Sequence, residues 1–163
     1  MLTFIFNYWK GREIIEREID PSRLIFAKRL PRDEYLAQFR VVDLFLDTLP
    51  YNAATTSSDA LRMGLPVLTC MGKSFASRIA ASVINSVNLP ELITTSEEEY
   101  ESLAIELANN PEKYKAIKDK LIHNLPRAPL YDTELFTKNI ESAYKVMYER
   151  NQEGLGPEHI YVE

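Results

Sequence analysis

Short runs of β-forming residues alternate with helical patterns along the first two-thirds of the chain, as is typical of a parallel sheet covered by helices. Each run places apolar or β-branched residues side by side. Four strands are expected, at Leu2–Phe6, Arg23–Phe26, Leu44–Leu46 and Pro66–Thr69. A fifth, short strand is expected at Leu92 and Ile93. The pattern therefore predicts an α/β fold.

Helical patterns fill the intervals between these strands. Helices are expected at Gly11–Glu18, Arg32–Val41, Thr55–Met63 and Phe75–Asn85. The last has the clearest periodicity, because Phe75 and the apolar residues at 79, 83 and 87 recur every four positions. This apolar stripe is expected to lie on the sheet.

After Thr95 the pattern becomes helical only. Ser96–Asn109 opens with a capping-box sequence, and Pro111–Leu125 begins with a proline in its first turn. A loop at Pro126–Tyr131 precedes an amphipathic helix that is expected to run from Asp132 to about Asn151. One side of that helix carries Phe136, Ile140, Tyr144, Met147 and Tyr148.

Length and composition indicate one globular domain. The chain has 163 residues, of which 45% are hydrophobic and 26% charged, so a disordered chain is excluded. Its net charge of −5 argues against a general affinity for nucleic acid. The apolar opening run, Met1–Trp9, is too short to cross a membrane, so neither nucleic acid nor membrane is expected as a partner.

The cysteine and histidine content excludes several kinds of site. Cys70 is the only cysteine, so the chain forms no internal disulfide, and a reducing, cytoplasmic location is expected. His123 and His159 lie at no spacing typical of metal ligands. No metal and no catalytic histidine are therefore expected.

The segment that follows the strand at Leu44–Leu46 carries the best candidate chemistry. Ligands of open parallel sheets bind beyond the carboxyl ends of the strands, and the loop Asp47–Ala54 leads from such an end to a helix start. Four small hydroxyl residues at 55–58 stand at that start, where free N–H groups and the macrodipole favour a phosphate. Asp59 lies one turn on and can accept hydrogen bonds from a ribose diol.

The same residues also have a purely structural interpretation. Threonine and serine are common helix caps, and an aspartate in the first turns commonly complements the helix dipole. The chain has neither a glycine-rich phosphate loop nor a dinucleotide fingerprint. From the residues alone, a nucleotide site and a plain helix cap both remain open.

A run of motifs adds a family resemblance. The chain resembles the C-terminal catalytic lobe of the O-GlcNAc transferase/SPINDLY-like protein glycosyltransferases. The resemblance rests on the motifs Asp47-Thr-Leu-Pro-Tyr-Asn52, Thr55-Thr56, Asp59-Ala-Leu61, Gly64-Leu-Pro66, Gly72 and Phe75-Ala-Ser-Arg78. Further similar stretches, such as Asp20–Phe26, Leu89–Ile93 and Pro129–Asp132, extend it from about Ile19 to Glu163.

The resemblance implies a fold. It is the C-terminal lobe of a two-lobed GT-B glycosyltransferase, a Rossmann-like parallel sheet with helices on both faces plus C-terminal helices. Residues 1–163 would then form a single nucleotide-sugar-binding lobe. Within it, residues 1–18 form a shortened first strand–helix unit, residues 96–152 the C-terminal helical part and residues 153–163 a tail.

The resemblance also implies a function. Such a lobe binds the donor of a protein O-glycosyltransferase, which transfers N-acetylglucosamine from UDP-GlcNAc to serine or threonine when an N-terminal catalytic lobe is present. GDP-fucose is the other donor in related SPINDLY-like proteins. The family's catalytic histidine belongs to the N-terminal lobe, so this chain is expected to carry no catalytic residue and to be inactive alone. The protein acceptor would bind through that lobe or through a repeat-helix domain.

The family's donor contacts fall on seven positions of this chain: Leu30, Arg32, Tyr35, Ala54, Thr55, Thr56 and Asp59. The resemblance assigns the diphosphate to the two threonines, the ribose to Asp59 and base-reading backbone groups to the region of Leu30. Animal members have lysine and histidine where this chain has Arg32 and Tyr35, and histidine in place of Ala54. One donor contact is therefore missing. The alternative is a truncated, non-catalytic module that binds a nucleotide or a partner.

Overall fold

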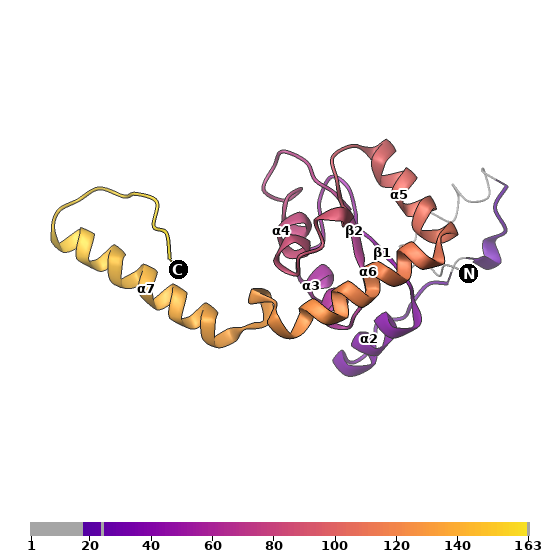
Figure 1. The fold of residues 1–163 in the computed structure, drawn as a ribbon, viewed down its shortest axis with the longest axis horizontal. Helices are drawn as coiled ribbons and strands as arrows, with labels where there is room; N and C mark the ends of the chain where they lie inside the picture. The colour runs from indigo at the N-terminus through magenta and orange to yellow at the C-terminus, as the bar shows by residue number, and fades with distance from the viewer. Residues whose placement is uncertain (1–17, 24, 163) are drawn as a thin grey trace.

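The computed structural model describes residues 18–23 and 25–162 of the chain (Figure 1). The expected strand Leu2–Phe6 and all but the last residue of the expected helix Gly11–Glu18 lie outside the described residues. Glu18 itself lies in a turn.

A parallel sheet forms the centre of the described fold. Its strands are β1 (Phe45–Leu46), β2 (Val67–Cys70) and β3 (Ile93–Thr94), in the order β1-β2-β3. Phe45 pairs with Val67, and Thr69 pairs with Ile93. All four residues of β2 are buried, which explains why this strand is an unbroken run of apolar residues and threonine. The parallel sheet and its helices confirm the predicted α/β fold.

Helices pack against the central strand and against one another. The elements α3 (Thr55–Arg62), α4 (Ile79–Ser86) and α5 (Glu97–Asn109) all contact β2, and α6 (Pro111–Asn124) packs on α5. Their shared core includes the fully buried side chains of Leu61, Leu68, Ile84, Leu89, Leu92 and Leu121. At the end of α3, Gly64 adopts a φ of +78°, a conformation that favours glycine.

Short 3-10 turns connect these elements. They are η1 (Pro21–Arg23), η2 (Phe39–Val41), η3 (Pro90–Leu92), η4 (Leu125–Arg127) and η5 (Pro129–Tyr131). The expected helix Arg32–Val41 is divided into α2 (Arg32–Gln38) and η2, whose Phe39 anchors it in the core. The expected loop Pro126–Tyr131 consists largely of η4 and η5.

The predicted strand Arg23–Phe26 is wrong. Arg23 ends the turn η1, and Ile25 and Phe26 lie in irregular chain with about half of their surface exposed. Neither residue pairs with any strand in the described part of the chain. A run of β-forming residues does not make a strand without a neighbouring strand to bond with.

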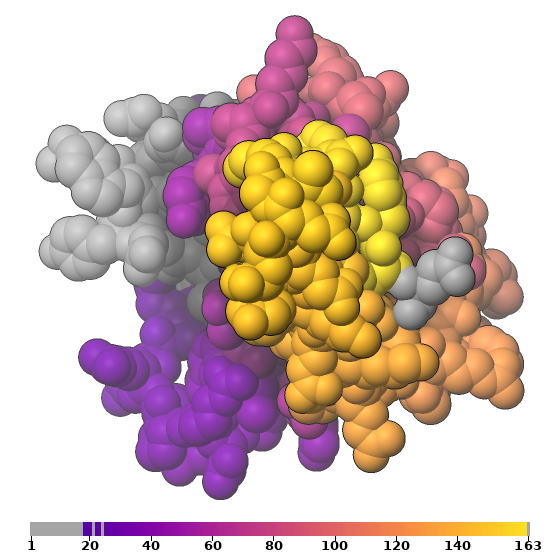
Figure 2. Space-filling model, turned by 90° about the vertical axis from the view of Figure 1, so that its left-hand side faces the viewer, coloured from indigo at the N-terminus to yellow at the C-terminus, as the bar shows by residue number. Residues whose placement is uncertain are grey.

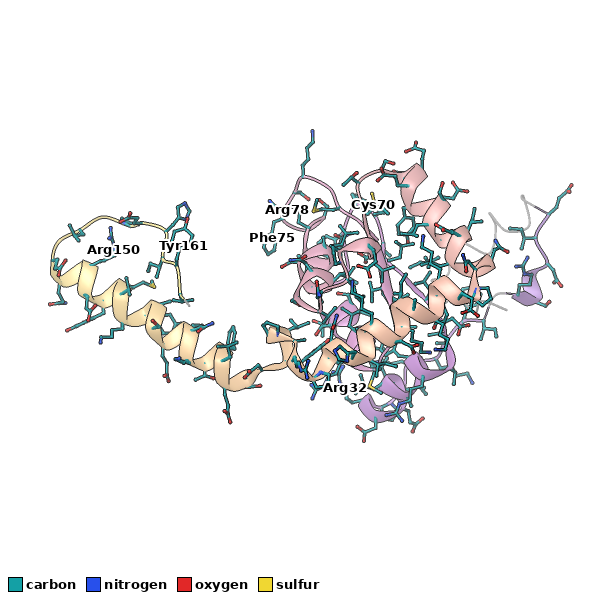
Figure 3. All side chains as sticks on the ribbon, in the orientation of Figure 1. Arg32, Cys70, Phe75, Arg78, Arg150 and Tyr161 are labelled. Carbon is teal, nitrogen blue, oxygen red and sulfur yellow. The ribbon has the colours of Figure 1, made fainter. Side chains whose placement is uncertain are left out.

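The predicted start of the fourth helix is also wrong. α4 begins at Ile79 rather than Phe75, and Phe75 is 86% exposed and points away from the body (Figure 3). Ser74 and Ser77 explain the difference, because their hydroxyls bond each other at 2.9 Å and the Ser77 hydroxyl also donates to the Ser74 carbonyl. These local bonds hold a loop instead of a helical turn. The apolar residues on the core side are the buried Ala80, Ala81, Ile84 and Val87 and the half-buried Val83.

The last helix, α7 (Thr133–Gln152), projects away from the body (Figure 1), and Figure 2 shows it standing in front of the remaining chain. The Asp132 side chain caps it by accepting from the Leu135 N–H at 2.9 Å. None of its residues is buried, and Phe136, Tyr144 and Tyr148 are more than half exposed. Although amphipathic as predicted, α7 leaves its apolar side uncovered. No described helix, α7 included, is long and apolar enough to cross a membrane.

Candidate functional site

The loop between β1 and α3 is held by one buried carboxylate. Asp47 is 5% exposed and lies directly after β1. Its Oδ1 accepts hydrogen bonds from the backbone N–H groups of Thr48 at 2.8 Å and Ala53 at 2.7 Å. Its Oδ2 accepts from the Thr69 hydroxyl of β2 at 2.6 Å. This side chain therefore joins the sheet to the residues that lead into α3.

Asp47 and a neighbouring tyrosine have shifted pKa values. Burial raises the pKa of the Asp47 carboxyl, and the hydrogen bonds from Thr69, Ala53 and Thr48 partly offset this rise. Tyr100 of α5 donates its hydroxyl proton to the Asp47 carbonyl at 3.0 Å. Burial raises the pKa of Tyr100 as well, so its hydroxyl remains a donor even above its ordinary pKa.

Asn52 fixes the far end of the same loop. It is completely buried, and its backbone N–H donates to the Ala76 carbonyl at 3.0 Å. Its side-chain amide donates to the Thr48 carbonyl at 3.1 Å. With Asp47 and Asn52 both bonded across the loop, the start of α3 has a defined position over the carboxyl end of the sheet.

The first turn of α3 leaves its N–H groups open. Ala54 stands at the N-cap and supplies no side-chain acceptor. The Ser57 hydroxyl points back to the carbonyls of Ala53 and Ala54, at 2.7 and 2.8 Å, and does not cap the turn. In the described chain, the N–H of Ser58 is the first of the helix to find an acceptor, the Ala54 carbonyl. Three free N–H groups at a helix start form the geometry in which anions bind.

Asp59 lies one turn further along α3 and is paired with Arg32. The Asp59 side chain is 10% exposed, and both of its carboxylate oxygens accept guanidinium hydrogen bonds at 2.7 Å. The Arg32 side chain is 60% exposed, and its guanidinium lies 5.7 Å from the centre of the Tyr35 ring. The fork geometry is the strong, bidentate form of an arginine–carboxylate pair.

The structure groups most of the seven predicted site residues. Thr55, Thr56 and Asp59 lie on α3, with Ala54 at its cap, while Arg32 and Tyr35 lie on α2 with Leu30 just before it. Thr55 is exposed and Thr56 half-buried, so both threonines are accessible. The ion pair brings α2 and α3 together at Asp59. What each residue does toward a ligand stays a prediction.

Two supporting residues were missed by the sequence reasoning. The Tyr131 hydroxyl donates to the Ser58 carbonyl of α3 at 2.7 Å, across 73 positions of sequence. Arg62 of α3 lies 5.9 Å from the centre of the Tyr131 ring. No local pattern predicts so distant a contact. The role of Asp47 could have been predicted, because an acidic residue directly after a buried strand needs hydrogen-bond partners.

A groove of about 750 Å³ lies beside this site at the carboxyl ends of the strands. Leu49, Pro50 and the residues from Cys70 to Ser74 line one part of it, and the start of α5 lines the other. The charged residues that line the groove are of both signs, namely Lys73, Glu97 and Glu98. Within residues 18–23 and 25–162, no three His, Cys, Asp or Glu side chains are grouped so as to hold a metal ion.

Comparisons of the chain with known proteins all point to one family. A model of glycosyl transferase family 41 matches residues 10–140. The chain is similar to a probable UDP-N-acetylglucosamine–peptide N-acetylglucosaminyltransferase SPINDLY of Hordeum vulgare, with 33% identity over 76% of this chain and 13% of the relative. It is also similar to the UDP-N-acetylglucosamine–peptide N-acetylglucosaminyltransferase of Caenorhabditis elegans, with 30% identity over 90% of this chain and 13% of the relative.

A solved structure agrees with these relatives. The fold matches a mutant of the Thermobaculum terrenum O-GlcNAc transferase with a TM-score of 0.79 and 33% identity. The match covers 85% of this chain and 26% of that one. The chain thus spans about an eighth of the length of the curated relatives it matches and about a quarter of the solved enzyme.

Replacing Asp47 tests the loop anchor. Asp47→Ala leaves two backbone N–H groups without their acceptor and is expected to lower the free energy of unfolding by about 2–3 kcal/mol. Asp47→Asn retains one oxygen for these groups and should cost less. Urea unfolding measures both variants, with the exposed Asp43→Ala as the matched control. Equal losses in Asp47→Ala and Asp43→Ala would contradict the anchoring role.

The pH dependence of the stability of Asp47→Asn provides a second test of the anchoring role of Asp47. Because the folded-state pKa of Asp47 is raised above 3.8, the folded state holds this proton more tightly than the unfolded state. The contribution of Asp47 to stability therefore falls as pH rises from about 4 through the raised pKa. The stability lost in Asp47→Asn should shrink between pH 4 and pH 7. A loss that grows over this interval would contradict the burial of a charged carboxylate.

Proposed function

Because this chain belongs to glycosyl transferase family 41, we propose that it is the donor-binding lobe of a protein O-glycosyltransferase. The observation that carries the proposal is the open first turn of α3, held over the carboxyl end of the sheet by Asp47 and followed one turn later by Asp59. An anion-binding turn next to a carboxylate suits a nucleoside diphosphate, which has a charged and a diol-bearing part.

The diphosphate would lie at the start of α3. The free N–H groups of residues 55–57 and the positive end of the helix dipole attract it, and the hydroxyls of Thr55 and Thr56 add donors. Asp59 repels phosphate but accepts hydrogen bonds from hydroxyls. It lies about 6 Å further along the helix axis, given a rise of about 1.5 Å per residue. This separation suits a ribose that follows the diphosphate.

The base would lie toward α2. We propose that backbone groups near Leu30 contact it, while Tyr35 offers a ring at the same edge. The relatives are named for UDP-N-acetylglucosamine, which favours UDP-GlcNAc as the donor, with GDP-fucose second. The proposal includes no metal ion, since the helix start and Arg32 supply positive charge for the diphosphate.

Transfer would require an N-terminal catalytic lobe, covalently joined in a longer chain or supplied separately. The uncovered apolar side of α7 supports this requirement, because Phe136, Tyr144, Met147 and Tyr148 expose more than half of their surfaces. The solved relative is about four times longer than the part that this chain covers, so it contains further protein for such a surface to contact. We propose that α7 packs on that lobe, which would bring the catalytic histidine and the protein acceptor.

One observation favours the alternative of a non-catalytic binding module. Ala54 has no polar side chain at the position just before the Thr55-Thr56 pair, so it cannot contact a donor there through a hydrogen bond. A module of this kind would bind the same nucleotide at the same turn but would not restore transfer when combined with a catalytic lobe.

Titration calorimetry with UDP, GDP, UDP-N-acetylglucosamine and GDP-fucose tests donor binding. The uridine ligands are expected to bind more tightly than the guanosine ligands. Asp59→Ala should weaken UDP binding about tenfold, because a charged acceptor of two ribose hydroxyls is lost, and should not weaken the binding of inorganic phosphate. Asp33→Ala, an exposed acidic residue on α2, is the matched control.

Two results would overturn this assignment. If none of the four nucleotides binds the folded chain at millimolar concentration, the donor site is wrong. If Asp59→Ala weakens UDP and inorganic phosphate by the same factor, then Asp59 does not contact ribose.

The α7 surface has a separate test. The double variant Phe136→Ser/Tyr144→Ser should retain the stability of the chain, because both side chains are exposed. It should lose co-purification with the part of the Thermobaculum terrenum O-GlcNAc transferase that this chain does not match. Lys138→Ser/Lys145→Ser, on the opposite side of α7, is the control and should retain it. Equal co-purification of both double variants would exclude the apolar side as the contact surface.

A further inference from the structure

The Asp59 carboxylate is fully engaged before any ligand arrives. Arg32 Nη1 donates to Oδ2 and Nη2 donates to Oδ1, each at 2.7 Å. A guanidinium fork occupies the edge of a carboxylate along which both oxygens can be reached together. A cis-diol that donates one hydroxyl to each oxygen approaches along the same edge. The ribose and Arg32 therefore compete for Asp59.

We propose that Arg32 is a latch, which closes Asp59 in the empty site and moves to the donor's diphosphate when the ribose enters. The inference rests on the proposed donor function of this site. Its chemistry is an exchange of partners: Asp59 gives up a guanidinium for two hydroxyls, and the released guanidinium pairs with a phosphate anion, for which its fork geometry is equally suited. The buried Asp59 carboxylate keeps a hydrogen-bond donor on each oxygen at both stages.

The two partners differ in their freedom to move, which makes Arg32 the moving part. Asp59 is 7% exposed on a helix that packs against β2 and is also bonded through Tyr131. The Arg32 side chain is 60% exposed, and α2, which carries it, has no buried residue. Arg32 can therefore leave by side-chain rotation, while Asp59 cannot follow it.

The ring of Tyr35 can keep the released Arg32 guanidinium close to the site. Its ring centre lies 5.7 Å from the guanidinium carbon of Arg32, within the range of a cation–π contact. The ring is in turn fixed edge-on against the buried Phe39, with 5.2 Å between the ring centres. The cation thus stays close to the start of α3 after it leaves Asp59.

The latch predicts opposite effects of one substitution on two ligands. Arg32→Gln opens Asp59, so uridine, which has the diol but no phosphate, should bind about two- to fivefold more tightly, the range expected for release of an ion pair whose cation is largely exposed. UDP loses its guanidinium contact at the same time and should bind no more tightly than to the parent chain. The ratio of UDP affinity to uridine affinity should fall.

Titration calorimetry of uridine, 2′-deoxyuridine and UDP with the parent chain, Arg32→Gln and the exposed control Arg40→Gln tests this exchange. The gain should appear for uridine and be absent for 2′-deoxyuridine, which lacks the diol, and Arg40→Gln should behave as the parent chain. Binding of uridine to Arg32→Gln alone would also support the latch, as a tightly closed one.

The outcomes separate the latch from the donor site. If the parent chain binds UDP but Arg32→Gln leaves uridine unchanged or weakens uridine and UDP alike, the latch is wrong and the donor site stands. If no protein binds any of the three ligands although all remain folded, the proposed function fails and the latch fails with it.

Discussion

The arrangement of this site depends on the buried carboxylate of Asp47. Its three hydrogen bonds join the end of β1, the Thr69 hydroxyl of β2 and the N–H of Ala53, two residues before α3. Burying a charge is unfavourable unless its hydrogen bonds are complete, so the loop has little freedom to adopt other conformations. This anchor therefore fixes the loop that leads into the open first turn of α3, while the packing of α3 on β2 and the Tyr131 hydrogen bond hold the helix that carries Asp59.

The polar side chains around Asp47 also form hydrogen bonds that hold the backbone. Asn52, Tyr100 and Tyr131 each donate to a backbone carbonyl, at Thr48, Asp47 and Ser58 respectively. The first N–H groups of α3 stay open for another reason, since Ala54 supplies no side-chain cap, and they lie where Thr55 is exposed. The rigid loop and the open turn together support the proposed binding of a diphosphate there.

Much of the fold was predictable because its signals are local. The unbroken apolar run at 66–69 predicted β2 to within one residue at each end, and the serine and proline at 96 and 111 predicted the starts of α5 and α6. The prediction of a strand at Arg23–Phe26 was wrong because a strand needs a neighbouring strand, which a local run of residues does not reveal. The prediction of a helix start at Phe75 was wrong because the serine hydroxyls around it form local hydrogen bonds that compete with the helix.

The site was predictable only in part, for the same reason. The order of strand, loop and helix placed Thr55, Thr56 and Asp59 together, whereas the pairing of Asp59 with Arg32 joins positions 27 residues apart. Sequence spacing carries no information on such a contact. The resemblance to the family likewise placed Arg32 near the donor but gave no indication of its partner in the empty site.

The central claim is that the first turn of α3 binds the diphosphate of a nucleotide. It is tested most directly by following the backbone amide resonances of the ¹⁵N-labelled chain during a titration with UDP. The account predicts the largest shifts at Thr55, Thr56 and Ser57, with smaller shifts at Asp59 and none along α7. Shifts confined to the groove residues Met71–Ser74 and Glu97, with α3 unchanged, would contradict it.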